Sequence, residues 1–170
     1  MNLKFVLYFT LVLNFALADS LFAQVSQADG KISKTNVLGV LNSFDTGLVK
    51  KDAAAVIACF ATNAVITAAA GAGEGPRPVM VTEDMKSFHS NLETSFNQYN
   101  DFKLQRKDVT IEISSDGQKA TSLSTLVETY HFTGTIQKIV TKESATFEMI
   151  GGRVLLTKMD LKSDSTFTKE

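Results

Sequence analysis

Three carboxylates and one phenol are the side chains of this sequence whose spacing could support chemistry. Glu128, Glu143 and Asp160 fall in successive runs of strand-like residues near the carboxyl terminus, and Tyr130 follows Glu128 by two positions. If these runs pair as antiparallel strands, Glu143 lies directly opposite Asp160, and facing carboxylates repel unless they share a proton or meet a cation. Such a pair in a partly apolar pocket could perform general acid and base catalysis. These four residues are therefore the candidate catalytic residues.

The sheet that must position them is predicted from its turns. Residues 109–167 form four strand-like runs separated by glycine-containing dipeptides that suit two-residue hairpin loops. Loops of this length pair the residues on either side, as Ile150 with Arg153. The turns are Asp116-Gly117, Thr133-Gly134 and Gly151-Gly152.

Alternation along these runs defines one face with a polar end and an apolar end. A change of one residue in the middle loop would instead turn His131 inward in place of Tyr130. Phe102 and Leu104 have the wrong parity to share this face with Val109, so a bulge is expected near residues 106–108. The polar end could also be a solvated rim. It comprises Ser122, Ser124, Glu128, Tyr130, Thr141, Glu143, Lys158 and Asp160.

Three helices are expected before this sheet. The first carries an apolar stripe at helical spacing from Val37 to Leu48, with Thr35 or Asn36 as its cap. Asp52 begins a second helix that runs to Phe60, and a short strand at 64–68 and a glycine-rich loop at 69–75 follow. Thr82 caps the third helix, which extends to about Tyr99 and has His89 at the edge of its apolar stripe.

Composition and the first residues indicate an exported protein with one globular domain. The 170 residues have a formal net charge of −1 and are 44% apolar, which favours a single globular domain. The low charge argues against nucleic acid or an anionic membrane as the main partner, so no membrane association is expected after signal cleavage. Residues 1–23 read as a secretory signal peptide, cleaved after Ala18 or Ala23, so the protein is expected to be exported to the periplasm or medium. A flexible lead at 24–33 and one domain at 34–165 follow.

No metal or cofactor is predicted. The two histidines, His89 and His131, form no short ligand motif, and the glycine-rich loop lacks the lysine and hydroxyl ending of a phosphate loop. Cys59 is the single cysteine, so no intramolecular disulfide can form, and its apolar neighbours indicate a buried thiol.

The order of elements resembles the nuclear transport factor 2-like superfamily, including its SnoaL-like and ketosteroid-isomerase-like members. The residues that carry the resemblance are the first helix around Leu41, the segment from Asp52 to Ile66 and the strand entry Gly151-Gly152-Arg153. The resemblance implies an α+β, cystatin-like barrel or cone, in which a strongly curved antiparallel sheet wraps around N-terminal helices. It also implies a pocket at the open end and a homodimer. No catalytic motif of a named subfamily is present.

Three functions follow as hypotheses. The leading one is an exported, non-catalytic domain that binds a small apolar or amphipathic ligand in the cone. The second is a cofactor-independent isomerase, cyclase or hydrolase that uses the pocket carboxylates, with Tyr130 or His89 binding a substrate oxygen. The third is a dimeric interaction module that uses the opposite face of the sheet, with Val127, Val140, Leu155, Met159 and Leu161. The expected ligand-binding residues are His89, Tyr99, Leu126, Glu128, Tyr130, Glu143 and Phe147.

Overall fold

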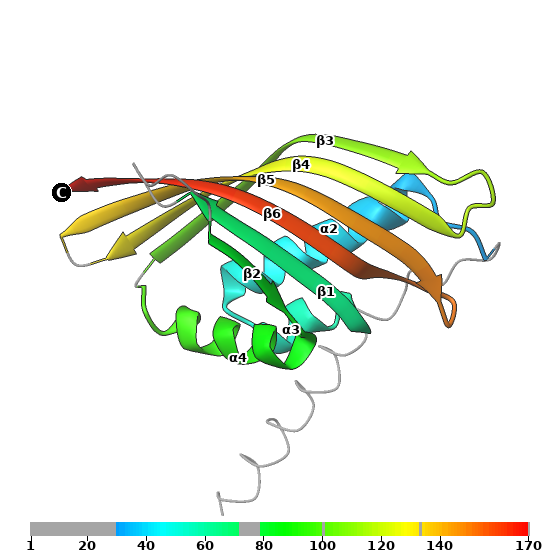
Figure 1. The fold of residues 1–170 in the computed structure, drawn as a ribbon, viewed down its shortest axis with the longest axis horizontal. Helices are drawn as coiled ribbons and strands as arrows, with labels where there is room; N and C mark the ends of the chain where they lie inside the picture. The colour runs from blue at the N-terminus through cyan, green and yellow to red at the C-terminus, as the bar shows by residue number, and fades with distance from the viewer. Residues whose placement is uncertain (1–29, 72–78, 100, 133, 170) are drawn as a thin grey trace, which may run out of the picture.

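The computed structural model describes residues 30–71, 79–99, 101–132 and 134–169 (Figure 1). The predicted signal peptide and part of the glycine-rich loop lie outside these residues, and export therefore stays a prediction. Within the predicted lead, Ile32 is buried and its amide donates to the carbonyl of Gly117 at 2.8 Å. This part of the lead thus packs against the turn between two strands. No helix of the described residues is long and apolar enough to cross a bilayer.

Among the described residues, three helices precede the long strands, and side chains cap each of them. Helix α2 (Lys34–Lys50) begins at Ser33, whose side chain accepts from the amide of Asn36 in a capping box. The predicted caps Thr35 and Asn36 are therefore wrong by two to three residues. Helix α3 (Ala53–Ile57) begins at Asp52, as predicted.

Helix α3 is shorter than predicted because the chain turns into a strand at Phe60. Helix α4 (Met85–Phe96) is capped by Asp84, whose side chain accepts from the amide of Ser87, and not by Thr82. Thr82 belongs instead to a strand that the sequence pattern did not reveal. The backbone of Thr82 pairs there with Thr67 of the neighbouring strand.

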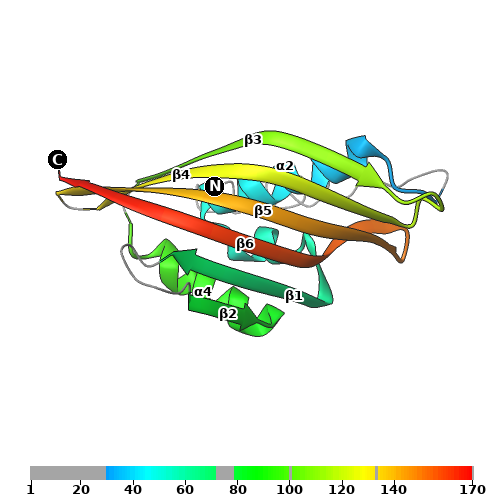
Figure 2. The ribbon, with the colours of Figure 1, turned by 45° about the horizontal axis from the view of Figure 1, so that its top comes forward.

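Six strands form one open, mixed sheet in the order β2-β1-β6-β5-β4-β3. Neighbouring strands are antiparallel except β1 and β6, which are parallel. In Figures 1 and 2 the sheet forms an arch, with α2 beneath it and α3 and α4 on the same side. The predicted α+β fold class is confirmed. The strands are β1 (Phe60–Gly71), β2 (Val79–Glu83), β3 (Asp101–Ile113), β4 (Lys119–Phe132), β5 (Thr135–Ile150) and β6 (Arg153–Lys169).

The strand pairings predicted at the second and third turns are confirmed, whereas the strand pairs at the first turn end at Ile113 and Ala120. Phe132 pairs with Thr135 and Ile150 with Arg153. The bulge expected on β3 is also present, because the register shifts between Lys107 and Thr110, and Asp108 has a positive φ of 53°.

A second bulge, on β6, corrects the prediction. The register of β5 and β6 shifts by one residue, since Phe147 faces Leu156 whereas Thr146 faces Lys158. Thr157 is the extra residue, and every side chain after it changes face relative to the simple alternation. Glu143 consequently lies opposite Leu161, not Asp160.

The inner face of the arch is the core of the domain. Side chains of α2 and α3 pack against the middle of the sheet, and each large side chain buried there contributes about 1.5–3 kcal/mol. Ser122 is the exception among these apolar neighbours, since its hydroxyl is buried and has no hydrogen-bond partner among the described residues. The largest fully buried side chains are Phe147, Leu41, Ile66, Leu156, Met159, Val37 and Val56.

Candidate ligand-binding site

Successive rows of the inner face carry two polar clusters. In the row nearer the core, Ser124 pairs with Glu143 across β4 and β5. In the next row, Leu126 of β4 pairs with Arg106 of β3 on one side and with Thr141 of β5 on the other. In the third row, Glu128 pairs with Ile139. The polar end predicted from the sequence therefore divides into a deep cluster around Arg106 and a shallower cluster around Glu128.

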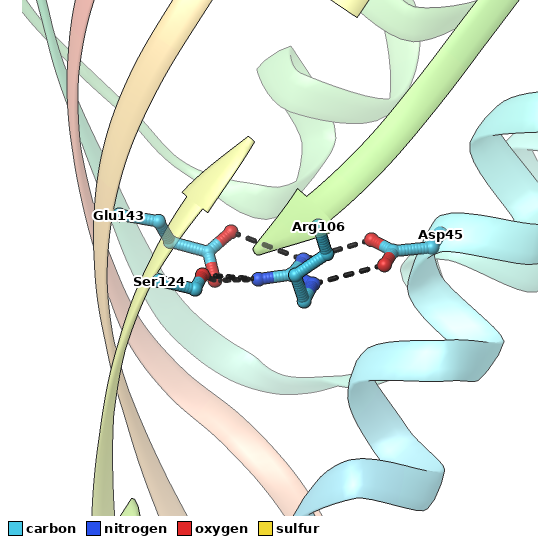
Figure 3. Close-up of polar contacts among 4 residues, drawn as sticks. All are labelled: Asp45, Arg106, Ser124 and Glu143. Carbon is cyan, nitrogen blue, oxygen red and sulfur yellow. Dashed lines mark hydrogen bonds and ion pairs between the residues drawn. The ribbon is translucent and has the colours of Figure 1, made fainter. Parts of the chain in front are cut away.

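The deep cluster is a buried ion-pair network (Figure 3). The guanidinium of Arg106 donates to both oxygens of Asp45, from Nε at 2.9 Å and from Nη2 at 2.8 Å. Its Nη1 donates to Glu143 and, at 2.6 Å, to Ser124, which in turn donates to Glu143 at 3.1 Å. The side chains of Arg106 and Glu143 are 7% and 0% exposed. The network joins α2 to β3, β4 and β5.

Arg106 remains charged in this position. Burial lowers the pKa of its guanidinium, but the hydrogen bonds and charges of Asp45 and Glu143 outweigh burial, so that the pKa is raised overall. Both carboxylates share this one cation, so the cluster as a whole keeps one negative charge. Glu143 is consequently engaged by a cation and is not available as a partner for a second acid.

The shallow cluster centres on Glu128, which is half-buried. The hydroxyl of Tyr130 donates to Glu128 Oε1 at 3.0 Å, and Thr141 donates to Oε2 at 3.4 Å. Thr141 also shares a hydrogen bond of 2.8 Å with Ser163 on β6. The ion pairs among the described residues do not include Glu128.

Burial therefore dominates the acidity of Glu128. It raises the pKa of this carboxyl, and the negative charges of Glu143 and Asp45 raise it further, against the lowering effect of the hydrogen bonds from Tyr130 and Thr141. A carboxyl with a raised pKa stays protonated to a higher pH than an ordinary one, and in that form it both donates and accepts hydrogen bonds.

Four aromatic rings stand beside this carboxyl. Tyr99 and Phe102 pack on Tyr130 with ring centroids 4.9 and 4.8 Å apart, and Phe132 stacks on its other side at 6.3 Å. Burial raises the pKa of Tyr99 to about 12, and burial and the charge of Glu128 raise that of Tyr130 further. The rings form an apolar wall with one phenol directed at Glu128.

Lys51 fixes the position of this wall. Its ammonium donates to the backbone carbonyl of Tyr99 at 2.7 Å and lies 4.3 Å from the centroid of the Tyr99 ring. Lys51 ends α2 in the left-handed conformation, with φ of 56°. The end of α2 is thus tied to the segment that leads from α4 into β3.

The structure brings together some of the predicted site residues. Glu128 and Tyr130 are in contact, Tyr99 joins them, and Leu126 is buried in the adjoining row. Phe147 is fully buried in the core.

The others lie elsewhere. The predicted pairing of Glu143 with Asp160 is wrong, because the bulge at Thr157 turns Asp160 outward, where it pairs with Lys158 at 2.6 Å. His89 lies 3.7 Å from Glu93 on α4 and borders an open surface groove with Lys51 and Phe96. No hydrogen bond or ion pair joins it to the Glu128 cluster among the described residues.

The prediction missed Asp45 and Arg106. Both could have been found from spacing, since Asp45 follows Leu41 by one helical turn and Arg106 shares the inward parity of Phe102 and Leu104. Among the described residues, no group of three or more histidines, cysteines and carboxylates is arranged to hold a metal.

Comparison with known proteins identifies structures of similar fold. No family profile and no curated protein matches the sequence. Solved structures do match. Hexachlorocyclohexane dehydrochlorinase LinA-type3 from Novosphingobium barchaimii has a TM-score of 0.62 at 13% identity, over 81% of this chain and 89% of that one.

Two proteins of unknown function are similar as well. One, with a cystatin-like fold, is from Nostoc punctiforme (TM-score 0.58, 14% identity, 77% of this chain and 90% of that one). The other, described as NTF2-like, is from Pseudomonas putida (TM-score 0.61, 11% identity, 76% and 84%). At such identities the likeness concerns the fold alone. The resemblance drawn from the sequence is thereby confirmed, and the chain has the fold of the nuclear transport factor 2-like superfamily.

Proposed function

We propose that this protein binds a small amphipathic molecule at the end of the arch that carries Glu128 and Tyr130, and that it does so without catalysis. The observation that carries the proposal is the half-buried carboxyl of Glu128, held by two hydroxyl groups beside a wall of aromatic rings. An apolar surface with a few convergent polar groups is the usual composition of a small-molecule site.

The surroundings of the cluster support access from solvent. The ends of β4, β5 and β6 extend past the helices in Figures 1 and 2. Inward positions there are partly or fully exposed, and Phe167, which faces Gln137 on β5, is 67% exposed. A ligand could thus place its apolar part along this end and its polar head at Glu128.

The chemistry of Glu128 favours a neutral polar head. Its raised pKa makes the protonated form more accessible than in an ordinary carboxyl, and that form pairs well with a hydroxyl or carbonyl. A carboxylate head would be repelled by the negative charge of the neighbouring acids once Glu128 ionises. The preferred ligand is therefore an alcohol or ketone with an apolar body.

Acid and base catalysis by Glu128 is the second candidate. It is favoured by the same raised pKa and by the hydrogen bond from Tyr130, which are typical of catalytic carboxyls. Against it, Glu143 is paired with Arg106 and Asp160 lies on the other face, so the two-carboxylate arrangement that motivated the enzyme hypothesis is not formed.

Ten-carbon compounds that share an alkyl chain but differ in their polar group test the proposal. Residues 24–170 contain no tryptophan and only two tyrosines, Tyr99 and Tyr130, so tyrosine fluorescence reports directly on the aromatic wall. We expect decanol to change this fluorescence and to raise the melting temperature more than decanoate does. Equal responses to both heads, or none, would contradict the proposal.

Two substitutions of Glu128 separate binding from catalysis. Glu128→Gln resembles the protonated carboxyl and should retain decanol binding, whereas Glu128→Leu should lose it. Glu112→Gln, on the exposed side of β3, is the matched control. An activity found with any substrate that Glu128→Gln abolishes without weakening binding would favour the catalytic candidate instead.

A further inference from the structure

Five exposed lysines gather on the outer face of the sheet, away from the Glu128 cluster. They occupy outward positions on three strands, in a chain whose formal net charge is only −1. They are Lys103 and Lys107 on β3, Lys138 and Lys142 on β5 and Lys162 on β6. We call this set the lysine face.

The strand registers arrange these lysines in two rows. Lys107, Thr125, Lys142 and Lys162 are successive partners across β3, β4, β5 and β6. Strands lie about 4.8 Å apart, so this row spans roughly 14 Å. A parallel row, four residues along the strands, consists of Lys103, Thr129, Lys138 and Thr166.

The charges of the lysine face are not balanced within the chain. The ion pairs among the described residues include none of its five members, whereas Lys158 and Lys119 on the same sheet are paired with Asp160 and Glu148. Lys142 lies directly opposite Lys162, and like charges in this position destabilise a sheet. Three carboxylates lie beside the rows: Asp164 faces Val140, Asp160 faces Ser144 and pairs with Lys158, and Asp101 faces His131.

The bulge on β6 creates this arrangement. With simple alternation, Lys162 would point into the core and Met159 and Leu161 would lie outside, as the sequence predicted for an apolar interface. The extra residue Thr157 instead buries Met159 and turns Lys162 into the row. The outer face is therefore more basic and less apolar than alternation predicts.

We propose that the lysine face binds a linear acidic polysaccharide. A row of cations across the strands matches a chain that carries anionic groups at intervals. The outward residues of β3 to β6 that the structure describes include no phenylalanine or tyrosine, and His131 is the one aromatic ring among them, so the face offers little on which nucleic-acid bases stack. The arch presents its convex side here, which suits a flexible chain better than a flat bilayer.

Binding to polygalacturonate, with its methyl ester as the uncharged control polymer, tests the proposal. We expect binding to polygalacturonate alone, weakened by added salt because the contacts are exposed. Replacing Lys107, Lys142 and Lys162 together by Gln should weaken it about tenfold, from the usual strength of three exposed charge pairs. Asp164→Asn should strengthen it.

Control variants make the result specific. A control variant replaces three lysines of the helices by Gln, namely Lys34, Lys50 and Lys86. This variant should bind polygalacturonate as the native protein does. The variant of the lysine face should melt no lower than the native protein, because it removes the repulsion between Lys142 and Lys162. The proposal is overturned by an equal loss in the helix variant, by no binding to polygalacturonate, or by tighter binding to an oligothymidine or to anionic vesicles.

Discussion

Arg106 and Glu143 lie 37 residues apart in the sequence and form an ion pair at the centre of the inner face. This pair decides what the carboxylates of the domain can do. It holds Glu143 within a network that also includes Asp45, and it leaves Glu128 as the acid that hydroxyl groups alone contact.

Arg106→Met should destabilise the protein by about 3–5 kcal/mol. The variant would leave Asp45 and Glu143 buried without a cation, and an uncompensated buried charge is costly. Urea unfolding measures the loss, with Lys103→Met on the exposed side of the same strand as the control, expected within about 0.5 kcal/mol of the native protein. Adding Glu143→Met to Arg106→Met should recover part of the loss.

The stability of the protein should depend on the protonation of Glu128. Its pKa in the folded state is raised above the ordinary value of 4.5, so the folded protein holds this proton more tightly than the unfolded chain. The resulting stabilisation is present below pH 4.5 and is lost as pH rises through the folded pKa. Its size is about 1.4 kcal/mol for each tenfold difference in proton affinity between the folded and unfolded states. Glu128→Gln lacks this titration. The unfolding free energy of the native protein, minus that of Glu128→Gln, should therefore fall as pH rises through the acid range. A difference that does not change with pH, or that rises with pH, would refute the expectation.

The two tyrosines of the aromatic wall should resist ionisation. The pKa of Tyr99 is raised to about 12 and that of Tyr130 is raised further. In a protein that begins at residue 24, the ultraviolet absorbance of phenolate should stay low through the ordinary range near pH 10, since no other tyrosine is present. The unfolded protein in urea supplies the reference titration. A full phenolate step near pH 10 in the folded protein would show that the wall is open to water.

Ser122→Ala should stabilise the protein by about 1 kcal/mol. The hydroxyl of Ser122 is buried without a hydrogen-bond partner among the described residues, and its removal ends that cost without leaving a large void. Ser124→Ala, one row away, should destabilise it, because Ser124 bonds to both Arg106 and Glu143. Thermal unfolding of the two variants should shift in opposite directions, and a shared direction would contradict this account of Ser122.

Deletion of single residues tests the bulge on β6. Removing Thr157 leaves Met159 and Leu161 on the inner face, so the variant should fold, with some loss of curvature. Removing Asp160 instead exchanges the faces of all later residues and turns Lys162 inward, so this variant should fail to fold. Circular dichroism and denaturant unfolding compare the two. Equal damage from both deletions would count against the assigned position of the bulge.

Much of the sheet could be predicted because its turns are local. The glycine dipeptides set the pairing of Phe132 with Thr135 and of Ile150 with Arg153, and the parity of Phe102 located the bulge on β3. The bulge at Thr157 carries no glycine. The apolar pattern does change parity there, from Val154 and Leu156 to Met159 and Leu161, but the prediction continued the alternation and so gave the wrong face to Lys158 and Asp160.

The site was predicted in part for the same reason. Glu128 and Tyr130 belong to one strand, and their spacing by two residues places them together whatever the partner strand does. Arg106 meets Asp45 across 61 positions of the chain, through the docking of α2 on the sheet. That contact depends on how a helix crosses the strands, which periodicity within either element does not specify.

The position of β6 also bears on when the protein can fold. The last strand of the chain lies in the interior of the sheet, between β5 and the parallel strand β1, whose residue Phe60 pairs with Leu156. Until the carboxyl-terminal residues have left the ribosome, β1 and β2 have no sheet to join, and the contacts that close the domain are distant in sequence and slow to form. The complete sheet, with β1 and β2 in place, can therefore form only once β6 is available.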